Sequence, residues 1–169
     1  DTVFVFPNNG NIILAAQQAA ELSQKDVRVI PTKNVAMGIA AAVAFQPDLS
    51  ADENAARMEE AAQRVRTGTI TYAVRNSEVE DMHISQGDII GLHNGKVEFK
   101  ADNVHDVAIP MMEAIVTEDD GLITVYYGAE TKEEDANALG EELERLFPDC
   151  DVEVHYGGQP LYYYLISVE

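Results

Sequence analysis

Residues 122–156, LITVYYGAETKEEDANALGEELERLFPDCDVEVHY, decide the fold class of this chain. They begin with an apolar, β-branched and aromatic run at Leu122–Tyr127, which is typical of a buried strand. Thr131 and Glu134 then have the spacing of a capping box, and leucines follow at helical spacing. A second apolar run at Val152–Tyr156 completes a strand–helix–strand unit, which favours parallel pairing and an α/β fold.

The same alternation extends from this unit to the rest of the chain. A second capping box is expected at Ser50 and Glu53, and Asn94-Gly95 supplies the positive φ angles of a tight hairpin turn. We predict an α/β fold of two small units with mixed, largely parallel sheets covered by helices. The other expected strands are 3–6, 27–30, 69–74, 88–93, 96–100 and 161–168, and the other expected helices are 12–22, 35–45, 51–65 and 104–116.

The boundary between the two units is expected within residues 78–103, where the hairpin interrupts the alternation. We place an N-terminal unit at residues 1–87 and a C-terminal unit, which opens with the hairpin, at residues 88–169. Residues 1–100 carry 13 acidic and 9 basic side chains, whereas residues 101–169 carry 17 acidic and 2 basic ones. The C-terminal unit is therefore the anionic part of the molecule.

The composition excludes several classes of protein. With 46% apolar and 24% charged residues, 169 residues can build a packed core. A formal net charge of −19 repels phosphate backbones and anionic headgroups, so we expect neither nucleic acid nor a lipid surface as the main partner. The longest apolar stretch, residues 35–45, is too short to span a bilayer. A single cysteine and no secretory leader indicate a cytoplasmic protein, and a first residue Asp1 suggests a domain of a longer polypeptide.

The helix predicted after Thr131 carries a large excess of carboxylates. Glu141 and Arg145 form its one well-placed i,i+4 pair, so like charges crowd the rest of its surface. A basic partner surface would offset this repulsion, although a solvated face that aids solubility explains the pattern equally well. The acidic loop at residues 118–120 extends the same field. The candidate partner-binding residues are Glu118, Asp119, Asp120, Glu133, Glu134, Asp135, Glu141, Glu142 and Glu144.

A second candidate site lies where the first strand gives way to a helix. Asn8, Asn9 and Asn11 surround Gly10 there, and Thr32 follows the second strand. Carboxyl ends of strands and N-termini of helices form the usual ligand crevice of α/β sheets, because free amides can hold an anion. Asn and Gly are also the preferred residues of plain turns and caps, and we favour this simpler interpretation.

Other residues give weaker signals of chemistry. Phosphate-loop, dinucleotide, serine-hydrolase and zinc-protease motifs are absent. Cys150 lies between two aspartates that oppose thiolate formation, so we interpret it as structural. Asp102, His105 and Asp106 share one helical turn and could meet a divalent cation, but acidic residues at that position also favour the helix dipole, and we predict no metal site. Tyr162–Tyr164 alternate across a strand, and are either buried on both faces or partly an exposed contact patch.

Four stretches of the chain together resemble a known family. They resemble the C-terminal domain of the bacterial fatty acid kinase catalytic protein (dihydroxyacetone kinase-like, DAK2 domain-containing family), and they keep its order over nearly the whole chain. The resemblance implies a two-part α/β fold similar to DegV-type lipid-binding proteins. The stretches are VFVFPNNGNIILAAQQAAEL (3–22), VRVIPTKNVAMGIAA (27–41), GDIIGLHNGKVEF (87–99) and LITVYYGAETKEEDANALGEELERLFPDCDVEVHYGGQPLYYYLISVE (122–169).

The resemblance also implies that catalysis takes place in another part of a longer protein. In that family an N-terminal kinase domain binds ATP and magnesium, and a central domain adds catalytic and dimerisation residues. The C-terminal domain contacts a separate fatty acid-binding carrier, whose acyl carboxylate is phosphorylated for phospholipid synthesis. We therefore expect no catalytic residue or cofactor in this chain, and an acidic groove that meets a basic surface of a DegV-like carrier.

The lipid-carrier pattern itself is only partly present. DegV-like carriers end with a His-x-Gly-Pro-Gly segment near the ligand head group, whereas residues 155–160 here read HYGGQP. No lipid-binding residue is therefore carried over from that family. Two other functions stay open on sequence grounds: a small-molecule or lipid-binding domain that uses the turn at residues 8–11, and a phosphotransferase in its own right.

Overall fold

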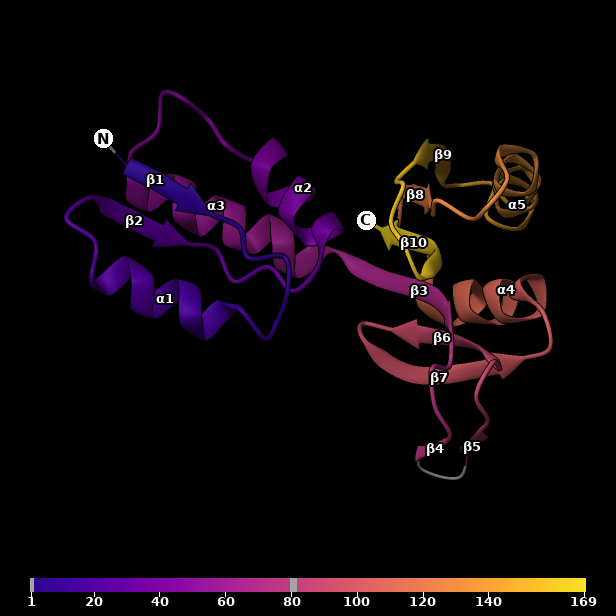
Figure 1. Ribbon diagram of the computed structural model, residues 1–169. Coiled ribbons are helices and arrows are strands. Elements are labelled where there is room, and N and C mark those ends of the chain that lie inside the picture. The colour runs from indigo at the N-terminus through magenta and orange to yellow at the C-terminus, as the bar shows by residue number, and fades with distance from the viewer. Residues whose placement is uncertain (1, 80–81) are drawn as a thin grey trace. The chain divides into compact units, whose positions relative to one another are not determined.

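The computed structural model describes residues 2–79 and 82–169, which fold as two units (Figure 1). The first unit is Asp1–Val65 and the second is Arg66–Glu169, so the division follows residue 65, whereas the sequence predicted it after residue 87. The reason is long-range pairing. Strand β3 (Arg66–Tyr72) is hydrogen-bonded to strands from the hairpin and from the end of the chain, which places it in the second unit. Residues 80 and 81 of the predicted boundary zone lie outside the described residues.

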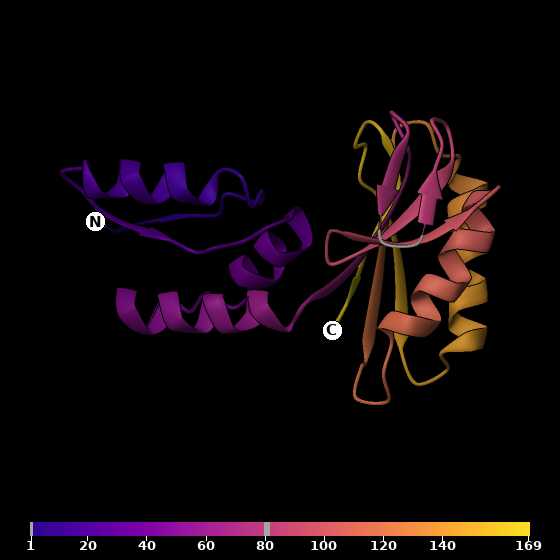
Figure 2. The ribbon, with the colours of Figure 1, turned by 90° about the horizontal axis from the view of Figure 1, so that it is seen from below.

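The first unit is a small parallel sheet between helices. β1 (Thr2–Val5) pairs in parallel with β2 (Asp26–Val29). Figure 2 shows α1 (Ile13–Glu21) on one side of these strands and α3 (Ala51–Arg64) on the other. The helix α2 (Val35–Val43) packs against α3. The buried core of this unit consists of Ile30, Ala41, Met58 and Ala62, with Phe4, Phe6, Met37 and Ala55 packed against it.

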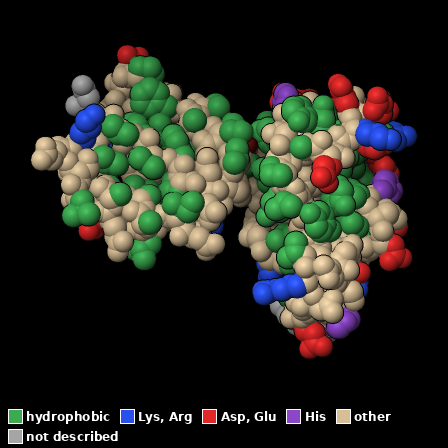
Figure 3. Space-filling view, viewed as in Figure 1, with side chains coloured by type: hydrophobic (Ala, Val, Ile, Leu, Met, Phe, Trp, Pro, Cys, Tyr) green, Lys and Arg blue, Asp and Glu red, His purple; other side chains and the backbone are tan. Residues whose placement is uncertain are grey.

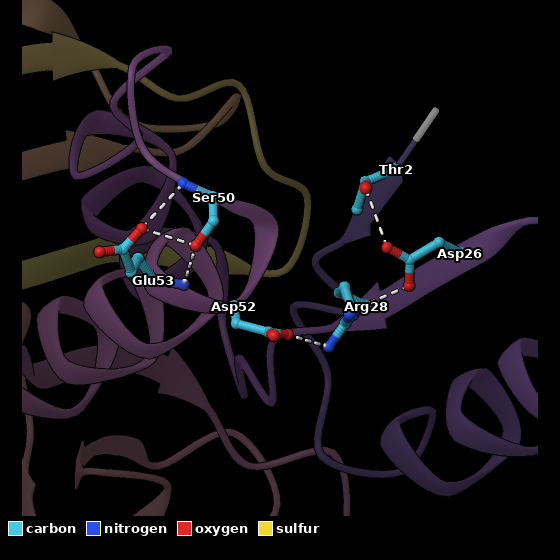
Figure 4. Close-up of polar contacts among 6 residues, drawn as sticks. All are labelled: Thr2, Asp26, Arg28, Ser50, Asp52 and Glu53. Carbon is cyan, nitrogen blue, oxygen red and sulfur yellow. Dashed lines mark hydrogen bonds and ion pairs between the residues drawn. The ribbon is translucent and has the colours of Figure 1, made fainter.

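Polar contacts tie strand β2 to the start of α3 (Figure 4). Ser50 and Glu53 form the predicted capping box: the Glu53 N–H donates to the Ser50 hydroxyl over 3.3 Å, and the Ser50 N–H donates to the Glu53 carboxylate over 3.0 Å. Arg28 on β2 contacts Asp26 of the same strand and Asp52 of the first turn of α3, each at 2.6 Å. These ion pairs are solvent-exposed, so they orient the elements more than they stabilise the fold.

The second unit is a six-stranded sheet with strand order β7-β6-β3-β10-β8-β9. The α/β class and the mixed sheets are confirmed. Among the described residues, however, β8 with β9 is the one parallel pair of this sheet, so parallel pairing is less extensive than predicted. The cause is β10, which inserts antiparallel to both of its neighbours, β3 and β8. The strands are β4 (Ser77–Val79), β5 (Met82–Ile84), β6 (Ile89–His93), β7 (Lys96–Ala101), β8 (Leu122–Tyr127), β9 (Asp151–Tyr156) and β10 (Tyr162–Val168), of which β4 and β5 form a separate two-stranded sheet.

Helices α4 (Val104–Ile115) and α5 (Glu133–Leu146) both cover one face of this sheet (Figure 2). α4 packs over β3, β6 and β7, and α5 packs over β8 and β9. Between helices and sheet lies the larger core of the molecule, which includes Met111, Ile123, Leu143 and Ile166. No helix in residues 2–79 and 82–169 is long and apolar enough to cross a membrane.

Local sequence signals at two turns have different outcomes. Asn94 and Gly95 adopt φ angles of 49° and 86°, as expected for the hairpin between β6 and β7. The capping box predicted at Thr131 and Glu134 is not formed: α5 begins after Lys132 without a side-chain cap. The Thr131 hydroxyl instead donates to the carbonyl of Tyr163 on β10 over 3.1 Å. A tertiary contact to the neighbouring strand has replaced the local cap.

Candidate functional site

Negative charge is concentrated in the second unit. Residues 66–169 carry 22 acidic and 6 basic side chains, a net charge of −16, against −3 for residues 1–65. Figure 3 shows acidic side chains gathered along the margin of the second unit, while the visible face of the first unit is mostly hydrophobic with few charges. The second unit therefore has the stronger electrostatic attraction for a cationic partner.

The carboxylates of α5 spread over the whole solvent-facing half of the helix. The buried face contains Ala136, Leu139, Gly140 and Leu143. Because each residue turns the helix by about 100°, the acidic residues divide into three pairs over the remaining surface. The pairs are Glu133 and Glu144 on the flank beside β9, Glu134 and Glu141 facing away from the sheet, and Asp135 and Glu142 on the flank toward α4.

The acidic N-terminus of α5 also has a local explanation. Glu133, Glu134 and Asp135 occupy the first turn, where negative side chains interact favourably with the helix dipole. Glu141 and Glu144 lie in later turns, where this effect is lost, and Arg145 donates to the main-chain carbonyl of Glu141 at 3.2 Å. The helix dipole therefore accounts for the first turn but not for the carboxylates that follow it.

The acidic loop between α4 and β8 is not uniform. Glu118 and Asp119 are exposed, but Asp120 is only 8% exposed and its carboxylate is used inside the fold. It accepts hydrogen bonds from the Thr117 N–H at 2.6 Å and the Thr117 hydroxyl at 3.0 Å, and it pairs with Arg66 at the start of β3. Burial opposes the ionisation of Asp120, but these contacts outweigh burial and lower its pKa. Asp120 is thus a structural residue, and the candidate partner surface loses it.

A cavity of about 460 Å³ lies between α4, α5 and β10. It is the feature that brings residues of distant parts of the second unit together. Val104, Ala108, Ala138 and Leu139 give it apolar walls. Its lining residues are Asn103, Val104, His105, Ala108, Glu130, Thr131, Asp135, Ala138, Leu139, Glu142, Tyr163 and Tyr164.

Tyr164 is the most deeply buried polar side chain in the lining of this cavity. It is 3% exposed, and its hydroxyl has no hydrogen-bond partner among the residues that the structure describes. Burial, with a smaller contribution from the charge of Asp135, raises the pKa of Tyr164 to about 12, so its hydroxyl is protonated at neutral pH. Sequence reasoning noted the tyrosine run, in which Tyr162 is exposed and Tyr164 buried, but not this cavity, because α4 and α5 approach each other only in three dimensions.

His105 on α4 reaches the acidic flank of α5. Its Nε2 lies 2.7 Å from the Glu142 carboxylate, and its Nδ1 lies 3.5 Å from Asp106. The hydrogen bond with Glu142 raises the pKa of His105 above its ordinary value of 6.5, and Asp106 acts in the same direction. The ion pair therefore stabilises the fold most fully below that ordinary value, and this contribution is lost as the pH rises through the higher folded pKa.

The titration of His105 is directly measurable. We expect its imidazole midpoint, followed by NMR, to lie above 6.5 in the unaltered chain and to fall in Glu142→Gln, because a neutral amide stabilises the imidazolium less. Glu141→Gln, on the same helix but without contact to His105, is the matched control and should leave the midpoint in place. An unchanged midpoint in Glu142→Gln would contradict the assigned pair.

The Asn-rich turn of the first unit is closed by its own hydrogen bonds. Thr32 is fully buried, and its hydroxyl donates to Asn8 Oδ1 at 2.8 Å while accepting from the Asn8 N–H at 3.0 Å. Asn8 adopts a φ of 53°, and its side chain lies against Gly38 of α2. Asn9 Oδ1 accepts from the Asn11 N–H at 2.9 Å. The structure thus brings Asn8 and Thr32 together as predicted, with their polar atoms used by each other.

Two weaker candidates have structural surroundings. Cys150 is buried, and its thiol donates to the carbonyl of Asp120 at 3.3 Å. Burial, followed by the charges of nearby aspartates, raises the pKa of Cys150, as the sequence indicated. Within residues 2–79 and 82–169, no group of three His, Cys, Asp or Glu side chains is arranged to hold a metal ion.

Comparison with known sequences gives one family for the whole chain. Residues 1–169 match the FakA-like C-terminal family model, which describes the C-terminal domain of fatty acid kinase subunits of this type. Protein YloV of Bacillus subtilis is 40% identical over 169 residues, and protein SH1689 of Staphylococcus haemolyticus is 34% identical over 165 residues. These alignments cover 100% and 98% of this chain but 31% and 30% of the relatives, so the chain spans about a third of their length.

Comparison with solved structures shows the fold. The Streptococcus pneumoniae fatty acid kinase (Fak) B3 protein, solved with linoleic acid, superimposes with a TM-score of 0.69 at 14% identity, over 98% of this chain and 70% of that one. DegV of Bacillus subtilis, described as a fatty acid binding protein, gives a TM-score of 0.63 at 17% identity, over 99% and 70%. The predicted DegV-like fold is therefore confirmed, and at these identities the likeness concerns the fold alone.

Proposed function

Because this chain belongs to the family of FakA-like C-terminal domains of fatty acid kinases, we propose that it docks a fatty acid-binding carrier of DegV-like fold through acidic side chains of its second unit. ATP, magnesium and the phosphoryl transfer would then belong to other parts of the parent protein. The observation that carries the proposal is the net charge of −16 in residues 66–169, with carboxylates over the exposed half of α5.

The distribution of charge on α5 fits a recognition surface. Glu134 and Glu141 are exposed and face away from the sheet, and no ion pair involving their carboxylates is found among the described residues. Unneutralised charge of one sign destabilises a fold, and a basic partner would remove that cost. Complementary charge across an interface mainly accelerates encounter and selects the partner.

The alternative proposal is ligand binding at the Asn-rich turn of the first unit. A ligand there would have to replace the contacts between Asn8 and Thr32, whose polar atoms already bond to each other. Displacing a satisfied buried hydrogen bond costs binding energy. Docking of a protein through the second unit requires no such rearrangement, so it is the better supported function.

The docking proposal predicts a specific loss of association rate. The double change Glu134→Lys and Glu141→Lys should slow association with a fatty acid-loaded DegV-like carrier by about tenfold at low salt, because it reverses the charge that steers encounter. The salt dependence of the rate should also become weaker. Stopped-flow measurements at low and at physiological salt would provide both quantities.

The matched control places the same charge change on the first unit. Glu21→Lys with Glu59→Lys alters the net charge equally, at exposed positions of α1 and α3. We expect a much smaller effect on the rate, arising from net charge alone. If both double variants slow association equally, or if neither does, the second unit is not the docking surface.

A further inference from the structure

The cavity between α4, α5 and β10 combines an apolar interior with a negative rim. Its walls are formed by the aliphatic side chains of Val104, Ala108, Ala138 and Leu139. Glu130, from the loop before α5, joins the two carboxylates of the α4-facing flank, Asp135 and Glu142, in its lining. None of the lining residues is lysine or arginine, so His105 is the one side chain of the lining that can become cationic.

A second feature of the cavity is an unused polar group. The Tyr164 hydroxyl has no hydrogen-bond partner among the described residues although the side chain is 3% exposed. Buried polar groups in native proteins are almost always hydrogen-bonded, so an orphaned hydroxyl in a cavity indicates a group that is satisfied by something bound there. Being protonated at neutral pH, this phenol can donate one hydrogen bond and accept another.

We propose that this cavity receives one lysine or arginine side chain of the docked partner protein. The inference rests on the proposed function for the identity of the partner, and it adds the point of anchorage. The aliphatic stem of the incoming residue would lie along Ala108, Ala138 and Leu139, and its cationic tip would meet Asp135 and the Tyr164 hydroxyl. Basic side chains bury their methylene stems in this manner while the charged end keeps polar contacts.

The chemistry of the cavity favours a cation over an acyl ligand. A volume of about 460 Å³ is within the range of small-molecule sites, so size alone does not separate the two. Three carboxylates in the lining would repel the head group of a fatty acid, whereas they attract an ammonium or a guanidinium. Arginine anchors that fill a desolvated pocket at the centre of an interface carry much of its binding energy.

The first test uses a small cation and needs no partner protein. n-Butylguanidinium, titrated into the chain and followed by NMR, should shift the signals of Leu139 and Tyr164. Asp135→Asn should weaken this binding by about tenfold, because a charge-assisted hydrogen bond is lost. Glu134→Gln is the matched control in the same first turn, outside the cavity lining, and should weaken it by no more than about twofold. Equal effects of the two variants, no shift at Leu139 and Tyr164, or oleate binding there in place of the cation would overturn the proposal.

The second test separates the cavity from the docking surface as a whole. Ala138 and its neighbour Asn137 are both exposed on α5, but only Ala138 lines the cavity. Ala138→Phe should fill the cavity and weaken partner binding by about tenfold, whereas Asn137→Phe should not, and circular dichroism would verify that both fold. If Ala138→Phe has no effect while charge reversal at Glu134 and Glu141 still slows association, docking stands and the anchor is wrong. If charge reversal has no effect but the small cation binds, the docking surface is wrong and the cavity site stands.

Discussion

Gly128→Ala is expected to abolish the cooperative folding of the second unit. Gly128 follows β8, and its N–H donates to the carbonyl of Tyr163 on β10 at 2.8 Å. A Cβ atom at this position would lie 1.9 Å from the carbonyl oxygen of Tyr162 and 2.9 Å from that of Gln159. Both obstacles are backbone atoms, so no side-chain rotation relieves the clash. We expect a loss of more than about 4 kcal/mol, which places the variant among the exceptional destabilising substitutions.

The matched control for this prediction is Gly121→Ala. Gly121 lies at the other end of the same strand, and an added Cβ there meets nothing within 4 Å. Chemical unfolding of both variants, followed by circular dichroism, should show a small change for Gly121→Ala and no native baseline for Gly128→Ala. A stable Gly128→Ala variant would mean that β10 can shift away from β8 at low cost. The loop after Gly128 also supplies Glu130 and Thr131 to the cavity, so a milder distortion would be detected as a loss of cation binding.

The local elements were predictable from the sequence because their signals are local. Helix α5 was expected to follow Thr131, and the structure has it at Glu133–Leu146. The turn at Asn94-Gly95 was expected from residue types that tolerate positive φ, and it forms as predicted. In both cases neighbouring residues alone determine the backbone conformation.

The arrangement of strands was harder to predict because it depends on partners far apart in the chain. β3 pairs with β10 near the end of the chain, where Thr71 lies opposite Tyr162. No local pattern specifies that pairing, and the predicted boundary was therefore placed beyond β3. The loss of the capping box at Thr131 has the same cause, because the Thr131 hydroxyl donates to Tyr163 on β10.

The candidate site was predicted in part. The acidic character of α5 follows directly from composition, but its division into three flanks required the orientation of the helix on the sheet. The cavity required the approach of α4 to α5, which places His105 beside Glu142 and leaves Tyr164 in a lining with an acidic rim. Asp120 was included with its exposed neighbours because sequence cannot separate a solvated carboxylate from one that is folded inward.

Asp120→Ala should destabilise the second unit by about 3 kcal/mol, because it removes one member of a buried ion pair and leaves the other without a counter-charge. Three donors lose their acceptor: the Thr117 N–H, the Thr117 hydroxyl and the Arg66 guanidinium. Arg66 also donates to the carbonyl of Ile115 at 3.0 Å, so it remains held at the end of α4 after the change. Asp119→Ala, an exposed neighbour, is the matched control and should change the free energy of unfolding by less than about 0.5 kcal/mol.

The pH dependence of unfolding distinguishes this ion pair from simple loss of packing. The pKa of Asp120 is lowered in the folded state, so the carboxylate contributes its full stabilisation above the unfolded-state pKa of about 3.9. That contribution is lost as the pH falls through the lower, folded pKa. The difference in unfolding free energy between the unaltered chain and Asp120→Asn should therefore be largest near neutral pH and shrink in acid. A difference that stays constant from neutral pH into acid would show that the charge of Asp120 does not stabilise the fold.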